Sequence, residues 1–412
     1  MRRATAVILI VLCAGPLAAC GDDPGEETTS TLRVYVSAPM KGGRGGEDTA
    51  SAVKIAVENA GGTVDSAAID VVALNDSAPD GAFDPKLVRD NALRAARDDR
   101  AIAYIGEFDS GGTELAMPIL NRAGILHVSS GSTALKLTKP SPAEGERLRP
   151  TGVTTFGRVV PNDMVQAGAL EEFMHQESVA TAYVVDDGGT YGVGLRRLFE
   201  KAATATGIKV IEGPRVSART EFGNLAEKIS RADPNALLYA GSDLELAFSL
   251  FESVHRTNGH IKLFGGDGLA LSGFLTTLGP IELDTYVTAP QLPAGNYARS
   301  GEDFLDGFRD EFGRDAEPMS VFGYEAGAAV MDSIRRGVRG DISTDAISTL
   351  RTGTREAFFD ITERASPLGS YSIDVNGDTT LPFYGAYRVE NGELVLGRTI
   401  DVPVSILQEL DQ

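Results

Sequence analysis

The sequence predicts an α/β protein made of two successive modules, each a parallel β-sheet covered by helices on both faces. Strand-like and helix-like segments alternate from residue 32 to about 290, and this alternation restarts after residue 150. Parallel strands need a long connection between them, so such alternation indicates βαβ units. The tail differs, because residues 369–402 alternate apolar and polar side chains as antiparallel strands do.

The first module is predicted from seven segments. The expected strands are 32–38, 68–74, 101–106 and 124–130, and the expected helices are 48–62, 85–99 and 111–123. Pro85 favours the first position of its helix, whose apolar residues recur on one face. These strands are short apolar runs, as expected of a sheet buried on both faces.

The second module repeats the pattern after the stretch PTGVTTFGRVVPND. The expected helices are 163–176, 191–207, 222–232 and 243–259, and the expected strands are 179–187, 208–216, 236–241 and 261–266. In the tail, Asn376-Gly377 and Asn391-Gly392 are hairpin signals. The sequence therefore predicts a small antiparallel element added to the α/β body.

The N-terminus has the composition of an export signal. Arg2 and Arg3 precede an apolar stretch that is short for a membrane span, and the small residues Leu17-Ala18-Ala19 lead to Cys20. The stretch LAAC resembles the bacterial lipoprotein box, which implies cleavage before Cys20 and lipidation of its sulfur. An ordinary signal peptide with a chance cysteine is the alternative. We expect residues 1–19 to be the signal peptide and residues 20–31 a flexible tether.

The composition argues against several classes of function. The chain has 412 residues and a formal net charge of −20, so nucleic acid is not an expected partner. Its four histidines lack metal-ligand spacing, and neither a nucleotide-binding loop nor a G-x-S-x-G motif is present. We expect no metal, cofactor or enzymatic activity, although a catalytic site assembled from distant loops stays open.

Polar residues follow four expected strands, and their spacing suggests a ligand site. Ser110 and Thr133 are 23 positions apart in the first module, while Asp243 and Asp267 are 24 apart in the second, each one strand-helix-strand step. Ligands of open parallel sheets bind beyond the carboxyl ends of the strands. Hydroxyl and N–H donors suit a carboxylate, and a buried acid suits an ammonium group, so the two sets predict a grip on an amino acid. Helix capping by Ser110 or Thr133, or a turn at Asp267, is the alternative interpretation.

These segments also resemble the leucine/isoleucine/valine-binding family, the type I periplasmic solute-binding proteins of ABC importers, over most of residues 32–405. The resemblance rests on GEFDSGGTELAMPILNRAGILHVSSGSTALKLT, FGRVVPNDMVQAGAL, VVDDGGTYGVGL, GGDGL and FGYEAGAAVMDSI, taken in this order and spacing.

The resemblance implies roles for individual residues. Ser110, Thr133 and the backbone at Gly131 would bind the α-carboxylate, and Asp267 the α-ammonium group. Tyr191 falls where an aromatic residue packs on the ligand. The remaining three implied positions depart from the family pattern: Asp243 where well-known members carry a tyrosine, and Lys41 and Arg44 in the first loop.

Lys41 and Arg44 are either exposed loop charges or a sign that the ligand has an acidic or polar side chain. Asp109 stands at one position of a cysteine pair that some members of the family have.

The resemblance further implies two lobes joined by three crossovers. The N-lobe would comprise residues 32–155 and 286–350, and the C-lobe residues 156–285 and 351–412. We expect a monomer that closes on a small-molecule ligand and presents it to an ABC permease, held at the membrane by the lipid on Cys20. A ligand sensor of the same fold, signalling to a membrane partner, is the alternative function.

Overall fold

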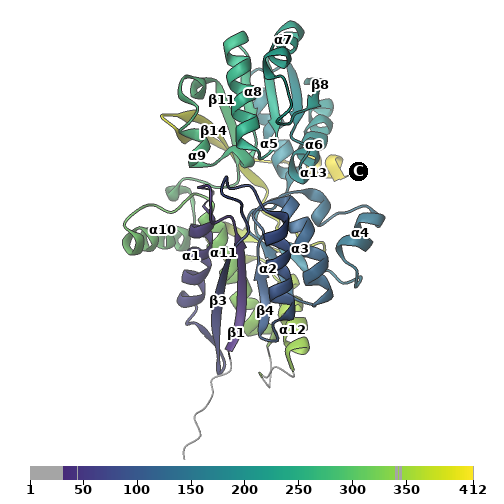
Figure 1. The fold of residues 1–412 in the computed structure, drawn as a ribbon. Coiled ribbons are helices and arrows are strands. Elements are labelled where there is room, and N and C mark those ends of the chain that lie inside the picture. The colour runs from purple at the N-terminus through teal and green to yellow at the C-terminus, as the bar shows by residue number, and fades with distance from the viewer. Residues whose placement is uncertain (1–30, 44, 339–341, 343–345, 412) are drawn as a thin grey trace, which may run out of the picture.

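The computed structural model describes residues 31–43, 45–338, 342 and 346–411. These residues form two lobes stacked end to end, each built on its own sheet, which confirms the predicted two-lobed α/β fold (Figure 1). The proposed signal peptide, the lipidation site Cys20, nearly all of the tether and Arg44 lie outside the described residues. Within the described residues, no helix is both long and apolar enough to span a bilayer.

The N-lobe contains a six-stranded sheet in the order β2-β3-β1-β4-β5-β6. Only the edge strand β2 is antiparallel to its neighbour. The strands are Thr31–Ala38 (β1), Thr63–Val64 (β2), Ala67–Asn75 (β3), Ala101–Ile105 (β4), Leu126–Ser129 (β5) and Phe156–Arg158 (β6). β4 is buried along its whole length because helices cover both faces of the sheet.

The helices of the N-lobe divide between the two faces of this sheet. One face is covered by Gly46–Asn59 (α1), Arg299–Phe312 (α10), Ser320–Gly337 (α11) and Ile347–Phe359 (α12). The other is covered by Pro85–Arg97 (α2) and Ser110–Arg122 (α3). Pro142–Leu148 (α4) packs beside α3. Arg364–Ser366 (β12) and Gly369–Tyr371 (β13) form a separate two-stranded ribbon.

The C-lobe contains a seven-stranded sheet in the order β15-β14-β11-β10-β9-β7-β8. Its strands are Thr181–Asp186 (β7), Lys209–Arg215 (β8), Ala236–Ala240 (β9), Lys262–Gly265 (β10), Thr285–Ala289 (β11), Phe383–Glu390 (β14) and Glu393–Asp401 (β15). The helices are Asp163–Gln176 (α5), Thr190–Thr206 (α6), Phe222–Ala232 (α7), Leu244–Thr257 (α8), Ser272–Leu275 (α9) and Val404–Asp411 (α13). Helices α5 and α6 cover one face of the sheet, and α7 and α8 cover the other.

The predicted antiparallel tail is present as an extension of the C-lobe sheet. β14 pairs antiparallel with β11 and with β15, and the turn between β14 and β15 has positive φ at Asn391 and Gly392. Two such residues favour a two-residue hairpin. The Asn376-Gly377 signal instead marks a tight turn closed by a single bridge between Ile373 and Thr379.

The chain passes between the lobes after Arg158, after Ala289 and before Phe383. The first and third passages lie side by side, because the Arg158 guanidinium donates to Asp378 Oδ1 at 2.7 Å and the Arg158 N–H donates to Gly377 O at 2.9 Å. The Arg158 side chain is fully buried there.

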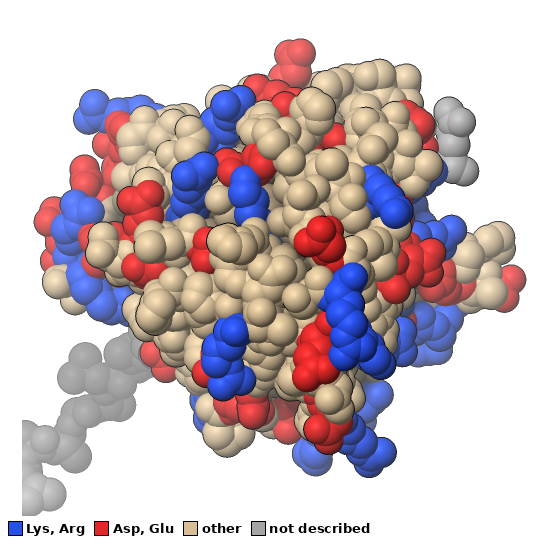
Figure 2. All heavy atoms as spheres, turned by 90° about the horizontal axis from the view of Figure 1, so that it is seen from above, with Lys and Arg blue, Asp and Glu red and all other residues tan. Residues whose placement is uncertain are grey.

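Two of the lobe boundaries expected from the sequence differ from those in the structure. Phe358, Ile361 and Tyr371 pack in the N-lobe core, so the C-lobe resumes at about residue 383 rather than at 351. β11, placed by the sequence analysis at the start of the second N-lobe piece, pairs in the C-lobe sheet. Seen from above in Figure 2, acidic and basic side chains are interspersed over the surface.

Candidate binding cleft between the lobes

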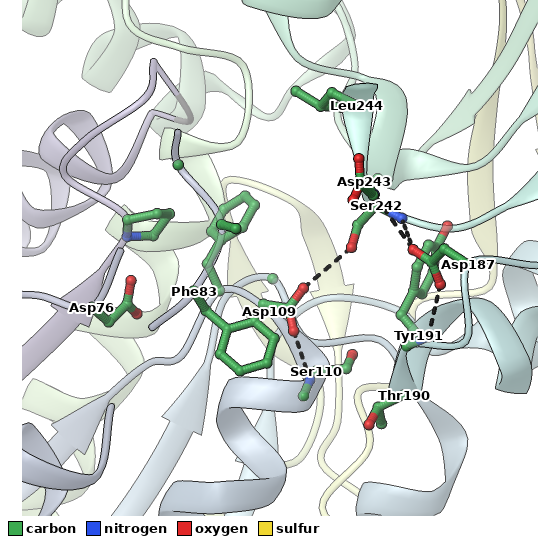
Figure 3. Close-up of a pocket in the computed structure, with 18 of the residues that line it drawn as sticks. Asp76, Phe83, Asp109, Ser110, Asp187, Thr190, Tyr191, Ser242, Asp243 and Leu244 are labelled. Carbon is green, nitrogen blue, oxygen red and sulfur yellow. Dashed lines mark hydrogen bonds between the residues drawn. The ribbon is translucent and has the colours of Figure 1, made fainter. Parts of the chain in front are cut away.

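The carboxyl ends of strands from both sheets face a cleft of about 700 Å³ between the lobes (Figure 3). Six of the residues singled out from the sequence line it: Ser110, Gly131, Thr133, Tyr191, Asp243 and Asp267. Lys41 is exposed and does not line the cleft, which agrees with its interpretation as a loop charge. The spacing argument therefore brought residues from four separate loops into one cavity.

Ser110 is the first residue of α3, but it does not cap that helix. The cap is Asp109, whose Oδ1 accepts hydrogen bonds from Gly111 N at 2.7 Å and Gly112 N at 3.4 Å. The Ser110 hydroxyl accepts instead from Ala134 N at 3.1 Å, which ties the start of α3 to the loop after β5. Because this bond uses an oxygen lone pair, the hydroxyl proton of Ser110 stays available to a ligand in the cleft.

The loop after β5 uses two of its serines to hold its own shape. Ser129 Oγ accepts from Gly131 N at 3.2 Å and from Ser132 N at 2.9 Å, and it donates to Glu107 O at 2.7 Å. Ser132 Oγ also lies 2.9 Å from Glu107 O. The Gly131 N–H, expected from the family resemblance to bind a carboxylate, is thus already engaged.

Gly131 is nevertheless required at its position, since a Cβ there would lie 2.9 Å from Phe108 O. The loop therefore passes close against Phe108 and carries the buried Thr133 to the wall of the cleft.

On the C-lobe side, Tyr191 and Asp267 form one polar group with Gln166. Tyr191 Oη donates to Gln166 Oε1 at 2.9 Å, and a Cβ on Gly266 would lie 2.1 Å from that hydroxyl. Burial raises the pKa of Asp267 to about 6, while the nearby polar groups of Tyr191 and Gln166 keep it from rising further. Asp267 is thus mostly ionised at neutral pH.

Asp243 has a structural role on the rim of the cleft. It is exposed, and its Oδ1 caps α8 by accepting from Leu246 N at 3.0 Å. Its neighbour Ser242 is held by Asp187, whose Oδ2 accepts from Ser242 N at 2.8 Å. The ends of β7 and β9 are joined in this way.

Two polar contacts cross the cleft and connect the lobes. Ser242 Oγ donates to Asp109 Oδ2 at 3.3 Å, and Thr190 Oγ1 donates to Glu114 Oε2 at 2.7 Å (Figure 3 shows the first). Glu114 also pairs with Lys136, at 2.7 Å, and with Arg147. These bonds hold the lobes against each other around the cavity.

The sequence analysis missed Asp76, Phe83 and Asp187, which also line the cleft. Asp76 follows β3 as Ser110 follows β4, so its position directly after an expected strand was a signal that could have found it. Burial and the charge of Asp109 raise the pKa of Asp76 to about 7. Phe83 lies in the loop before α2, where no periodic pattern indicates which side chains face inward.

Two further carboxyl groups are sealed behind the walls of the cleft. Glu107 accepts from Tyr104 Oη at 2.5 Å, and burial with the nearby charge of Asp76 raises the pKa of Glu107 to about 8. Burial and the charge of Asp267 likewise raise the pKa of Asp163 to about 8, partly offset by the Thr133 hydroxyl. His127, beside Glu107, is neutral because burial lowers its pKa to about 3. No group of acidic, histidine or cysteine side chains within the described residues has the arrangement of a metal site.

Comparisons with known proteins agree on one family. Residues 33–371 match the family model described as periplasmic binding protein. The chain is 24% identical to the Leu/Ile/Val-binding protein homolog 1 of Brucella melitensis over 291 residues, which are 70% of this chain and 72% of the relative.

Solved structures share the fold. The leucine-binding protein LivK of Thermotoga maritima superposes with a TM-score of 0.76 at 20% identity, over 90% of this chain and 99% of that one. An ABC transporter solute-binding protein of Rhodopseudomonas palustris, in complex with p-hydroxybenzoic acid, gives a TM-score of 0.74 at 16% identity, over 90% and 98%.

Proposed function

The chain belongs to the periplasmic binding protein family, whose members bind solutes outside the cytoplasm, and on that premise we propose that it captures an amino acid and delivers it to an ABC importer. The observation that carries this proposal is the division of chemistry across the cleft. The N-lobe wall presents the hydroxyls of Ser110 and Thr133, and the C-lobe wall presents the carboxylate of Asp267.

These groups fit the two charges that every α-amino acid carries. A hydroxyl donor bound to a carboxylate forms a charge-assisted hydrogen bond, which is stronger than a neutral one. Asp267 supplies a half-buried negative charge for the ammonium group at the wall of the cleft. Because the two sets belong to different lobes, an amino acid bound to both favours the closed form.

The acid on the C-lobe wall also bears on the choice between amino acids and aromatic acids. The Rhodopseudomonas palustris neighbour is described with p-hydroxybenzoic acid, which has a carboxylate but no ammonium group. Such a ligand would leave Asp267 buried without a cationic partner, which is costly. An amino acid has both a carboxylate for the N-lobe hydroxyls and an ammonium group for Asp267.

The remaining parts of the proposal concern where the protein acts. Cleavage before Cys20 and attachment of lipid to its sulfur would anchor the protein at the outer face of the cytoplasmic membrane, with residues 20–31 as a tether. A single anchor keeps a monomer at high local concentration near a membrane permease.

A thermal-shift screen of the protein without residues 1–19 tests the proposal. A ligand that binds only the folded state raises the melting temperature, so we expect a shift from at least one of the twenty L-amino acids and none from benzoate or p-hydroxybenzoate. Isothermal titration then gives the stoichiometry, expected to be one. A response to the aromatic acids alone would contradict the assignment of an amino acid.

A further inference from the structure

We infer that the ligand carries a positive charge on its side chain and that Asp76 is the counterion for that charge. This inference rests on the proposed function, because it takes the α-carboxylate and α-ammonium groups to be held at the two walls described above. It adds a second acidic subsite to the same cavity and thereby names the ligand class.

Asp76 has the position and the unmet bonding capacity of such a counterion. Its side chain is 1% exposed, and it lines the same cavity as Asp267. Oδ2 lies 3.5 Å from Ser37 Oγ, which is a weak contact, and Oδ1 has no hydrogen-bond partner among the described residues. A buried carboxyl oxygen without a partner costs stability, and a ligand that donates to it removes that cost.

Among the described residues, the groups that face Asp76 are acidic or neutral. Asp109 and Glu107 are the acids next to it, Ser37 and Tyr104 are neutral, and α2 contributes the amide of Asn91, which donates to Ser37 and to the backbone rather than to Asp76. A ligand with a negative side chain would be repelled by ionised Asp76. A ligand with a cationic side chain would neutralise Asp76.

The charged side chains that line the rest of the cavity are also mostly acidic. Its described lining side chains include eight acids and one base, Arg89. Glu114 pairs with Lys136 and Arg147. The excess of acids over bases among the described lining residues favours a cation and raises its rate of association.

An aromatic ring completes the subsite. Figure 3 shows Phe83 between Asp76 and Asp109, and Phe108 lines the same cavity. Guanidinium and ammonium groups bind over the faces of aromatic rings, and the aliphatic stem of arginine or lysine packs on the same apolar surface. A carboxylate beside an aromatic face is thus a suitable site for the end of a basic side chain.

Paired ligands test the inference by isothermal titration. L-citrulline has nearly the shape of L-arginine but no charge, and L-norleucine is the neutral partner of L-lysine. We expect L-arginine to bind at least ten-fold more tightly than L-citrulline, and L-lysine more tightly than L-norleucine. Equal or weaker binding of the charged ligand, or tighter binding of L-glutamate, would overturn the inference and leave the proposed function intact. Failure of every amino acid to bind would instead overturn the proposed function.

Substitutions locate the preference at Asp76. In Asp76→Asn the ratio of L-arginine to L-citrulline affinity should fall to within three-fold of unity, while L-citrulline binds as before. Asp80→Asn is the matched control, because Asp80 lines the same cavity but is exposed and accepts from Ala82 N at 3.1 Å. The ratio should be unchanged in the control. An unchanged ratio in Asp76→Asn would assign the cation to another acid and overturn the role of Asp76.

A measurement on the unmodified protein tests the inference without depending on the folding of a variant. Between pH 8.5 and pH 5.5 the affinity ratio of L-arginine to L-citrulline should fall several-fold, because protons compete with the cation for Asp76. Protonation of Asp267 weakens the binding of both ligands equally, so it does not change the ratio of their affinities. A ratio that does not change with pH contradicts the inference.

Discussion

The two walls of the cleft have a similar arrangement of acidic side chains but differ in the groups that surround them. In each wall, a carboxyl that lines the cavity lies in front of another that is sealed behind it: Asp76 with Glu107 in the N-lobe, and Asp267 with Asp163 in the C-lobe. The nearby polar groups of Tyr191 and Gln166 lower the pKa of Asp267, whereas Asp76 has only a weak contact with Ser37. The C-lobe acid is thus supported in its charged form before a ligand arrives, and the N-lobe acid is not.

This difference separates a general function from a specific one. A carboxylate held ionised by its own lobe suits the ammonium group that all amino acids share. A carboxyl that stays unsatisfied until a cation arrives contributes mainly when the side chain of the ligand is charged, and so discriminates among amino acids.

The largest expected effect comes from removing the supported acid. Asp267→Asn should weaken the binding of L-arginine and L-citrulline alike by roughly 100-fold, or about 3 kcal/mol, because the ammonium group is left without its counterion. Titration calorimetry measures the loss, and an unchanged melting temperature without ligand shows that the fold is intact. Asp243→Asn is the control, since Asp243 is exposed and caps α8. Wild-type affinity in Asp267→Asn would disprove the assignment of the ammonium site.

The sealed acid of the C-lobe should affect stability rather than binding. Asp163 ionises near pH 8 in the folded chain and near pH 4 when unfolded, so its contribution to stability is full below pH 4 and is lost as the pH rises to 8. Asp163→Asn, neutral throughout, removes that loss. Between pH 5 and pH 8 the wild type should therefore lose about 4 kcal/mol more of its unfolding free energy than the variant does.

Denaturant titration at the two pH values measures this difference, with Asp243→Asn again as the exposed control. If the variant and the wild type lose stability equally between pH 5 and pH 8, Asp163 is already ionised in the folded chain, and the sealed acids of the two walls are not alike.

The sequence predicted the C-lobe acid and the N-lobe hydroxyls, but not the N-lobe acid. Ser110, Thr133 and Asp267 each follow a buried strand, and strand ends of parallel sheets meet at one edge. Asp76 meets the same rule after β3, but the sequence analysis applied it to the later strands only. The capping role of Asp109 was not predicted, because one residue of offset decides which side chain turns back to the helix N–H groups.

The boundaries of the lobes could not be obtained from local patterns. The apolar residues Phe358 and Ile361 would suit the core of either lobe, and only tertiary packing assigns them to the first. In the sequence, the segment that forms β11 is likewise an apolar run that does not indicate which sheet it joins. The alternation of elements predicts how many layers exist, but not which sheet each late segment joins.

A smaller effect is expected on the neutral part of the N-lobe wall. Ser110→Ala removes the hydroxyl proposed to bind the α-carboxylate and also the acceptor of Ala134 N, so affinity should fall about ten-fold and stability by about 1 kcal/mol. Ser141→Ala, which removes an exposed capping box at α4, should cost similar stability with no change in affinity. If both variants leave ligand affinity unchanged, the hydroxyl of Ser110 only joins two loops.

The smallest effect is expected at Lys41, which tests whether charge outside the cleft matters. Its side chain is exposed and its backbone N–H donates to Ser77 Oγ at 3.1 Å, so Lys41→Ser should keep the loop and leave affinity for L-arginine and L-glutamate within two-fold. Surface charges at this distance act mainly on association rates and are screened at physiological salt. A switch toward cationic ligands in Lys41→Ser would mean that Lys41 reaches the ligand when the lobes close, and that selectivity belongs to this loop rather than to the contrast between Asp76 and Asp267.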